Sequence, residues 1–191
     1  MLPITILLTE QYSDWEIASL AGLGRAFYGA DIDYATPLGG QVTSVAGLTI
    51  ANTKRFEAPT RGVVVVCGSP GFENNPAPEI EARLQQASGS GCVVAGICGG
   101  TAVLARAGLL DHVRHTSNAP GYLEKHAPAY AGGAHYVDQP SALRDENIIT
   151  APAPAPASFA VAVLTAAGVD EQAAAQIRFL LGKEHTKENW V

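Results

Sequence analysis

The sequence predicts an α/β fold: a doubly wound, mostly parallel sheet with helices on both faces. Strand-like and helical patterns alternate along the chain, and several strands are uninterrupted apolar runs. Such runs are typical of a parallel sheet that is covered on both sides. The 191 residues are 47% hydrophobic and 16% charged, which is a globular composition. Because no repeat and no shift in composition divides the chain, we expect one domain over residues 1–191.

The first half of the chain predicts a βαβ opening, with strands at Ile4–Leu8 and Ile32–Ala35 and a helix at Trp15–Tyr28. A hairpin of Gln41–Val45 and Leu48–Asn52 follows, and then a buried strand at Val63–Cys67. The middle of the chain continues with a helix, an apolar strand and a helix that Gly108 ends, at Pro78–Ser88, Cys92–Ile97 and Thr101–Ala107. A last strand and two helices are expected at Asn147–Thr150, Phe159–Ala167 and Glu171–Leu181. Alternating Ala and Pro at 151–156 predict an extended loop, and residues 183–191 a polar surface tail.

Charge and hydropathy exclude several classes of function. A net charge of −6 disfavours nucleic-acid binding, which normally needs a basic face. No apolar run approaches the length of a membrane span, and no cationic segment precedes an apolar one at the N-terminus. Three cysteines without a C-x-x-C pair argue against a disulfide framework and a zinc site. We therefore expect a soluble, cytoplasmic protein.

Cys98 stands in a pattern typical of a nucleophile elbow. An apolar strand is followed at once by Cys98 and a predicted helix, with Gly96 and Gly100 two positions to either side. A nucleophile on such a sharp turn needs neighbours without side chains, and a helix N-terminus stabilises a thiolate. We therefore expect Cys98 to be a reactive thiol. For Cys67 and Cys92, inside apolar strands, the expected role is that of a small buried hydrophobic residue.

Two further segments follow strands at the same edge of the sheet. Glu16 lies one turn into the first helix and could approach Cys98. The spacing Ser13-x-x-Glu16 is equally that of a capping box, which would occupy the carboxylate at the helix start, so both interpretations stay open. The turn Cys67–Gly71 can point backbone N–H groups into the crevice, where they and the Gly99 N–H could form an oxyanion hole. A simple tight turn is the alternative.

The histidines and the search for nucleotide-binding motifs give weaker indications of function. His115 and His135 are candidates for a base or an orienting partner of Cys98, although a lone histidine more often has a structural role. His112 and His115 have no further ligand cluster, so we expect no metal. The chain contains neither a Walker loop nor G-x-G-x-x-G, so no nucleotide or other cofactor is expected.

Taken together, these segments resemble the ThiJ/PfpI superfamily, the class I glutamine amidotransferase-like group. The resemblance extends over nearly the whole chain and rests on Ser13–Glu16, Cys67–Gly71, Ala95–Gly100, Ala107–Leu110, Arg114–Asn118, Asn147–Ala151 and Phe159–Ala160. It implies a flavodoxin-like fold, a homodimer and a reactive Cys98 hydrogen-bonded by a protonated Glu16 carboxyl. The family's oxyanion donors would be the backbone N–H groups of Ser69 and Gly99.

The sequence also departs from the family's pattern. Ser69 and Pro70 replace the more usual Gly-Gly turn, and Gly99 stands where many relatives have a histidine after the nucleophile. His115 resembles a position characteristic of a small bacterial, single-domain stress-protein subgroup. His135 resembles the distal histidine of the parkinsonism-related branch.

The resemblance implies a cysteine-dependent enzyme in which Cys98 attacks a small electrophilic carbon while Glu16 handles the proton. A glyoxalase- or deglycase-like activity, or a related hydrolase or hydratase activity, would use these groups. One alternative is a redox-sensing or stress-protective protein that acts through oxidation of Cys98. Another is a non-catalytic binding module.

Overall fold

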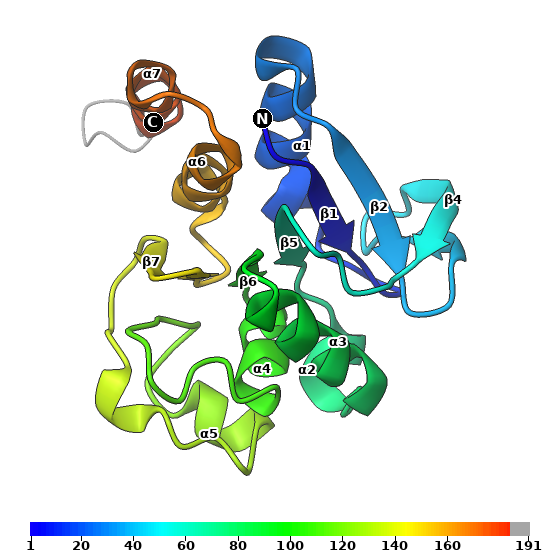
Figure 1. Ribbon diagram of the computed structural model, residues 1–191, viewed down its shortest axis with the longest axis vertical. Coiled ribbons are helices and arrows are strands. Elements are labelled where there is room, and N and C mark those ends of the chain that lie inside the picture. The colour runs from blue at the N-terminus through cyan, green and yellow to red at the C-terminus, as the bar shows by residue number, and fades with distance from the viewer. Residues whose placement is uncertain (184–191) are drawn as a thin grey trace.

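The computed structural model describes residues 1–183, which form one eight-stranded sheet with helices on both faces (Figure 1). The predicted tail lies outside the described residues except for Lys183. The strands in chain order are β1 (Ile4–Leu7), β2 (Ile32–Thr36), β3 (Gly40–Thr43), β4 (Thr49–Arg55), β5 (Val63–Val66), β6 (Val93–Ile97), β7 (Leu143–Asp145) and β8 (Ile148–Ala151). Across the sheet they run β3-β4-β2-β1-β5-β6-β8-β7.

All strand pairs in the middle of the sheet are parallel, and only the edge strands β3 and β7 are antiparallel to their neighbours. The chain winds outward in both directions from β1 and β5, so the predicted doubly wound, mostly parallel fold is confirmed. Every residue of β5 and β6 is buried. Valine suits such strands because its branched side chain packs well on a pleated surface.

Helices cover both faces of the sheet, as Figure 1 shows. In chain order they are α1 (Asp14–Tyr28), α2 (Pro70–Asn74), α3 (Pro78–Gly89), α4 (Gly99–Arg106), α5 (Tyr122–His126), the 3₁₀ turn η1 (Gly133–His135), α6 (Pro156–Ala167) and α7 (Glu171–Gly182). Helices α1, α6 and α7 pack in the hydrophobic cluster of one face, and α2–α5 in that of the other. None of the helices within residues 1–183 is long and apolar enough to cross a membrane.

Four short elements, α2, α5, η1 and β7, were not predicted from the sequence. These elements are too short to show a periodic hydrophobic pattern, and local and tertiary contacts stabilise them. Helix α2 begins where the Ser69 hydroxyl accepts a hydrogen bond of 3.1 Å from the N–H of Phe72. Strand β7 exists because a tight turn, with Glu146 at φ 50°, returns the chain to pair with β8.

Both edges of the sheet are irregular or short. The pairing of β3 with β4 shifts register between Gly40 and Val42. At the other edge, β7 has only three residues. The sheet therefore ends in a bulged strand on one side and a very short strand on the other.

The turn between β6 and α4 depends on two glycines that let the helix pack directly on the strands. A Cβ atom added to Gly100 would lie 2.1 Å from the carbonyl oxygen of Val66, and one added to Gly96 would lie 3.0 Å from the carbonyl oxygen of Gly100. The first separation is a severe clash with backbone that cannot move without disturbing β5. The spacing of these glycines around Cys98 is therefore required by close packing.

We expect Gly100→Ala to destabilise the fold by several kcal/mol, on the order of the largest single-residue effects, because the methyl group meets fixed backbone. Gly22→Ala is the matched control, since a Cβ at this position in α1 meets nothing within 4 Å and alanine favours a helix by about 0.8 kcal/mol. Urea unfolding of the two variants measures the difference. Equal stabilities would contradict the packing argument.

Candidate active site

Cys98 occupies a strained backbone position at the junction of β6 and α4. Its φ of 53° and ψ of −124° are unusual for a residue with a side chain. The hydroxyl of Thr101 donates a hydrogen bond of 2.6 Å to the Cys98 carbonyl, and the Thr101 N–H donates another of 3.0 Å. The thiol is half-buried. This is the geometry of a nucleophile elbow, held in place by the first turn of the helix.

Glu16 projects from α1 into the same site and is completely buried. Its Oε2 accepts a hydrogen bond of 2.8 Å from the N–H of Gly68, whereas its Oε1 has no hydrogen-bond partner within residues 1–183. A Cβ added to Gly68 would lie 2.9 Å from both Oε1 and the Cys98 Cβ, so the carboxyl and the cysteine converge on this glycine. The Ser13 side chain makes no capping bond. The capping-box interpretation is therefore wrong.

The carboxyl and the thiol compete for one negative charge. Burial raises the pKa of Glu16 to about 7, although the hydrogen bond from Gly68 acts to lower it. Burial and then the charge of Glu16 raise the pKa of Cys98 to about 11, against the opposing effects of Asn118 and the Gly99 N–H. The helix N-terminus alone led us to expect an acidic thiol. In the structure, burial and the neighbouring carboxylate outweigh that effect, so the resting thiol keeps its proton.

The backbone of Ser69 and Gly99 meets beside Cys98. A Cβ added to Gly99 would lie 3.2 Å from the carbonyl oxygen of Ser69 and 3.4 Å from its nitrogen. A side chain at position 99 would therefore crowd the Ser69 backbone. Neither N–H donates a hydrogen bond to an oxygen within the described chain.

Asn118 contacts the nucleophile, although the sequence analysis assigned it no role. Its Nδ2 donates a hydrogen bond of 3.4 Å to the Cys98 Sγ, and its Oδ1 accepts one of 2.9 Å from the N–H of Ala153. The second contact sets the orientation of the amide, because only the NH₂ group then faces the sulfur. The only sequence signal for this residue was its place in the segment Arg114–Asn118 that resembles the family.

Tyr122 is a second residue that the sequence analysis missed. Its hydroxyl is buried and has no hydrogen-bond partner within residues 1–183. Burial, and then the charges of Glu73 and Cys98, raise the pKa of this phenol above its ordinary value. A buried hydroxyl without a partner is costly and rare in folded proteins. Two such buried side-chain atoms occur in the described chain, Glu16 Oε1 and Tyr122 Oη, and both side chains interact electrostatically with Cys98.

Helices α2 and α5 hold Tyr122 in place through His126. The Tyr122 and His126 rings pack with their centroids 4.6 Å apart. The two ring nitrogens of His126 lie 3.1 Å from the Glu73 carbonyl oxygen and 3.4 Å from its carboxylate. Arg106 adds bonds to the carbonyl oxygens of His126 and Phe72, so the short helices are tied to α4.

Neither predicted histidine contacts Cys98 in the structure. His115 is fully buried, with Nδ1 2.7 Å from the Val113 carbonyl oxygen and Nε2 2.5 Å from the Tyr130 hydroxyl. Burial lowers the pKa of His115, which keeps the ring neutral. His135 lies in η1, and its carbonyl oxygen accepts a hydrogen bond of 3.3 Å from the His115 N–H. The geometry therefore gives no support to either histidine as the base for Cys98.

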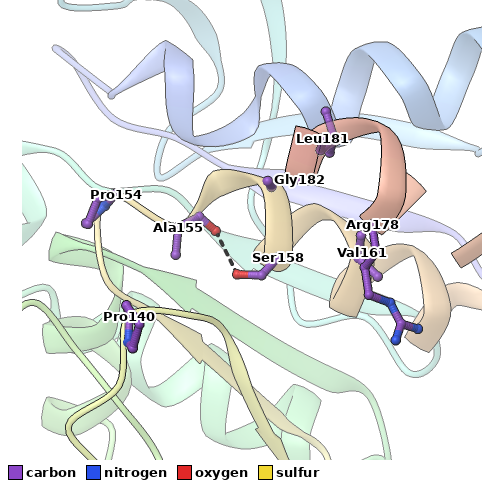
Figure 2. Close-up of a pocket in the computed structure, with 9 residues that line it drawn as sticks. Pro140, Pro154, Ala155, Ser158, Val161, Arg178, Leu181 and Gly182 are labelled. Carbon is purple, nitrogen blue, oxygen red and sulfur yellow. Dashed lines mark hydrogen bonds between the residues drawn. The ribbon is translucent and has the colours of Figure 1, made fainter. Parts of the chain in front are cut away.

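Two cavities lie near the loops that follow β8. One, of about 350 Å³, is lined by residues that include Ser117 and Asn118, and so opens beside the partner of Cys98. The other, of about 370 Å³, lies between the start of α6 and the end of α7 (Figure 2). Pro140 and Pro154 line both cavities. Within residues 1–183, no group of three or more His, Cys, Asp or Glu side chains could hold a metal ion.

Comparisons with known proteins agree with this fold. A model of the DJ-1/PfpI family matches residues 3–166. The DJ-1 superfamily protein Atu0886 from Agrobacterium tumefaciens is 35% identical, with a TM-score of 0.88 over 97% of this chain and all of that one. A thiJ/pfpI family protein from Bacillus anthracis is 26% identical, with a TM-score of 0.85 over 99% of this chain and 95% of that one.

YoaZ of Bacillus subtilis, called an uncharacterized protease, is 33% identical over 126 residues, which are 64% of this chain and 60% of that one. Fold and elbow together define a flavodoxin-like α/β protein of the ThiJ type. The chain belongs to the DJ-1/PfpI family.

The raised pKa of Glu16 makes a prediction about stability. A carboxyl with a pKa near 4.5 when unfolded and about 7 when folded stabilises the fold below pH 4.5, and this contribution is lost as the pH rises through 7. Glu16→Gln has no proton to lose. We therefore expect the unfolding free energy of the variant, relative to the wild type, to increase by about 3 kcal/mol between pH 4.5 and a pH above 7.

Urea unfolding at several pH values measures this difference. Glu79→Gln is the control, because it makes the same change of charge on a side chain that is 78% exposed. A stability difference between Glu16→Gln and the wild type that stays constant with pH would contradict the assignment of a buried, protonated carboxyl.

Proposed function

We propose that the protein is a cysteine-dependent enzyme that acts on a small electrophilic carbon, such as the carbonyl carbon of a glyoxal. The observation that carries the proposal is the pairing of Cys98 with a buried carboxyl whose pKa lies near neutrality. A general base is most effective when its pKa is close to the working pH. A glyoxalase- or deglycase-like activity and a related hydrolase or hydratase activity all begin with this step.

In the proposed mechanism, the Cys98 Sγ attacks the electrophilic carbon while the Glu16 carboxylate accepts the thiol proton. The new C–S bond forms as the C=O π electrons move to oxygen, which gives a hemithioacetal oxyanion. We assign the stabilisation of that oxygen to the backbone N–H groups of Ser69 and Gly99, because the two backbones approach each other next to Cys98. Glu16 then returns its proton to the product.

The hydroxyl of Tyr122 has no hydrogen-bond partner within residues 1–183, which favours a substrate oxygen as its partner. Glu16 reaches Cys98 from α1, on one face of the sheet, and Tyr122 from α5, on the other. A substrate oxygen close to either atom would give it the hydrogen-bond partner that it lacks within residues 1–183. The cavity of about 350 Å³ beside Asn118 has room for a small molecule.

We expect Cys98→Ser to abolish the consumption of methylglyoxal, used as a probe, and Glu16→Gln to lower kcat/KM by about 10²–10⁴-fold at pH 7, the usual contribution of a general base. Cys92→Ala is the control, because the Cys92 thiol bonds to the Pro59 carbonyl oxygen on the opposite face of the sheet. Steady-state rates measure these effects. Unchanged consumption in Cys98→Ser would refute this enzyme function and leave a non-catalytic binding module.

We expect Tyr122→Phe to lower turnover without loss of stability, since the hydroxyl makes no hydrogen bond in the described chain. Tyr130→Phe is the matched control. It removes the partner of the buried His115 ring and should cost about 1–3 kcal/mol in unfolding free energy. Thermal unfolding and probe turnover separate the two. A Tyr122→Phe variant that is fully active would exclude the phenol from the reaction.

We also propose that the protein is a homodimer and works in the cytoplasm, on the strength of its family membership. Sedimentation at micromolar concentration tests the first point. A mass of two chains is expected, and a mass of one chain would contradict it.

A further inference from the structure

A second thiol adjoins the Glu16 carboxyl. Cys67 directly follows β5, and its Sγ lies 3.7 Å from the Glu16 Oε2 and 3.4 Å from the Ser13 carbonyl oxygen. The side chain is completely buried, and the mechanism proposed above does not use it. Two cysteines therefore share one carboxyl, an arrangement that a merely space-filling Cys67 does not require.

The sheet places Cys67 and Cys98 within reach of each other. Strands β5 and β6 are parallel neighbours, with Val66 opposite Gly96, and continuing this register by two residues would place Gly68 level with Cys98. With ideal spacings of about 4.8 Å between strands and about 3.3 Å per residue, the Cα atoms of the two cysteines would lie roughly 6 Å apart. The two thiols also interact electrostatically, which agrees with this proximity. Disulfides need about 4.4–6.8 Å.

The side chains also lie on the same side of the sheet. Cys67 belongs to the hydrophobic cluster beneath α1 and α6, and Cys98 packs against that cluster. A Cβ added to Gly68 would lie within 3 Å of both the Glu16 carboxyl and the Cys98 Cβ, so these groups approach one another at this glycine. Cys92 is different, because it precedes β6 at the opposite end of the strand and belongs to the cluster of the other face.

We propose that Cys67 is a resolving thiol, which forms a disulfide with Cys98 after a hydroperoxide has oxidised Cys98 to a sulfenic acid. In the first step the Cys98 sulfur gives up its proton to the Glu16 carboxylate and attacks a peroxide oxygen. The O–O bond breaks, the sulfur loses two electrons, and the departing oxygen takes up the proton to leave as water or an alcohol. In the second step the Cys67 sulfur attacks the sulfenic sulfur, the S–S bond forms, and hydroxide leaves.

Glu16 is placed to move the proton in the second step. Its Oε2 contacts the Cys67 thiol, and the carboxylate can accept that proton and pass it to the departing hydroxide as water. Burial raises the pKa of Cys67 well above its ordinary value, so the thiol needs this base. Two equivalents of an added thiol then restore both cysteines. The disulfide would protect Cys98 from irreversible oxidation, and it requires no turnover of a carbonyl substrate.

The test is to treat the intact protein with hydrogen peroxide, unfold it in the presence of N-ethylmaleimide, and measure the mass and the peptide map. The wild type should lose two hydrogens, bind maleimide at Cys92 alone, and yield a peptide that links Cys67 to Cys98 and is cleaved by dithiothreitol. Cys67→Ala should instead gain two or three oxygens at Cys98, which dithiothreitol does not remove. Cys92→Ala should form the disulfide as the wild type does.

Two outcomes would overturn the proposal: a wild type in which Cys98 gains oxygen while Cys67 still binds maleimide, or one that peroxide leaves unchanged. If Cys67→Ala does not fold, Cys67→Ser serves in its place, and the wild-type peptide map decides by itself. Because the readout is a covalent link rather than a rate, the result is independent of whether the protein consumes methylglyoxal.

Discussion

The buried carboxyl of Glu16 is the constraint on which the rest of the site depends. It is removed from water and accepts one backbone hydrogen bond, so its charged form is costly and its pKa rises to about 7. Every neighbour must accommodate that group. Gly68 has no side chain because the carboxyl occupies the space, and Cys98 cannot ionise easily while Glu16 is charged. The reactivity of Cys98 therefore depends on whether the shared proton is on its thiol or on the Glu16 carboxyl.

The position of the site follows from the topology of the sheet. Parallel strands bring the chain segments after β1, β5 and β6 to one edge, where a helix from each face can reach the same point. Helix α1 provides the carboxyl from one side, and the segment of Asn118 and Tyr122 approaches from the other. Residues separated by more than a hundred positions in the chain come together because the order of the strands brings them to one edge of the sheet. No short sequence motif contains both sets of residues.

The sequence predicted the parts that local physics determines. The run Val63–Val66 can only be a buried strand, and glycines two positions from Cys98 indicate the elbow. Glu16 stayed ambiguous because one spacing serves both a helix cap and a catalytic carboxyl. Asn118 and Tyr122 could not be found, since Asn118 lies in a loop and Tyr122 in a short helix, both positioned by tertiary contacts. His115 looked like a base in the sequence, but the fold uses both of its nitrogens.

The irregular edges of the sheet have a consequence for how copies of this protein can meet. An open edge of regular strand is a template on which another chain can add a strand, and this is a common start of aggregation. Here the register shift in β3 and the short length of β7, three residues, leave few regularly spaced backbone groups with which another strand could pair. Growth of the sheet from one molecule into the next is disfavoured at both ends. Contact between copies is thereby directed to the helical and loop surfaces, where side chains rather than backbone hydrogen bonds choose the partner.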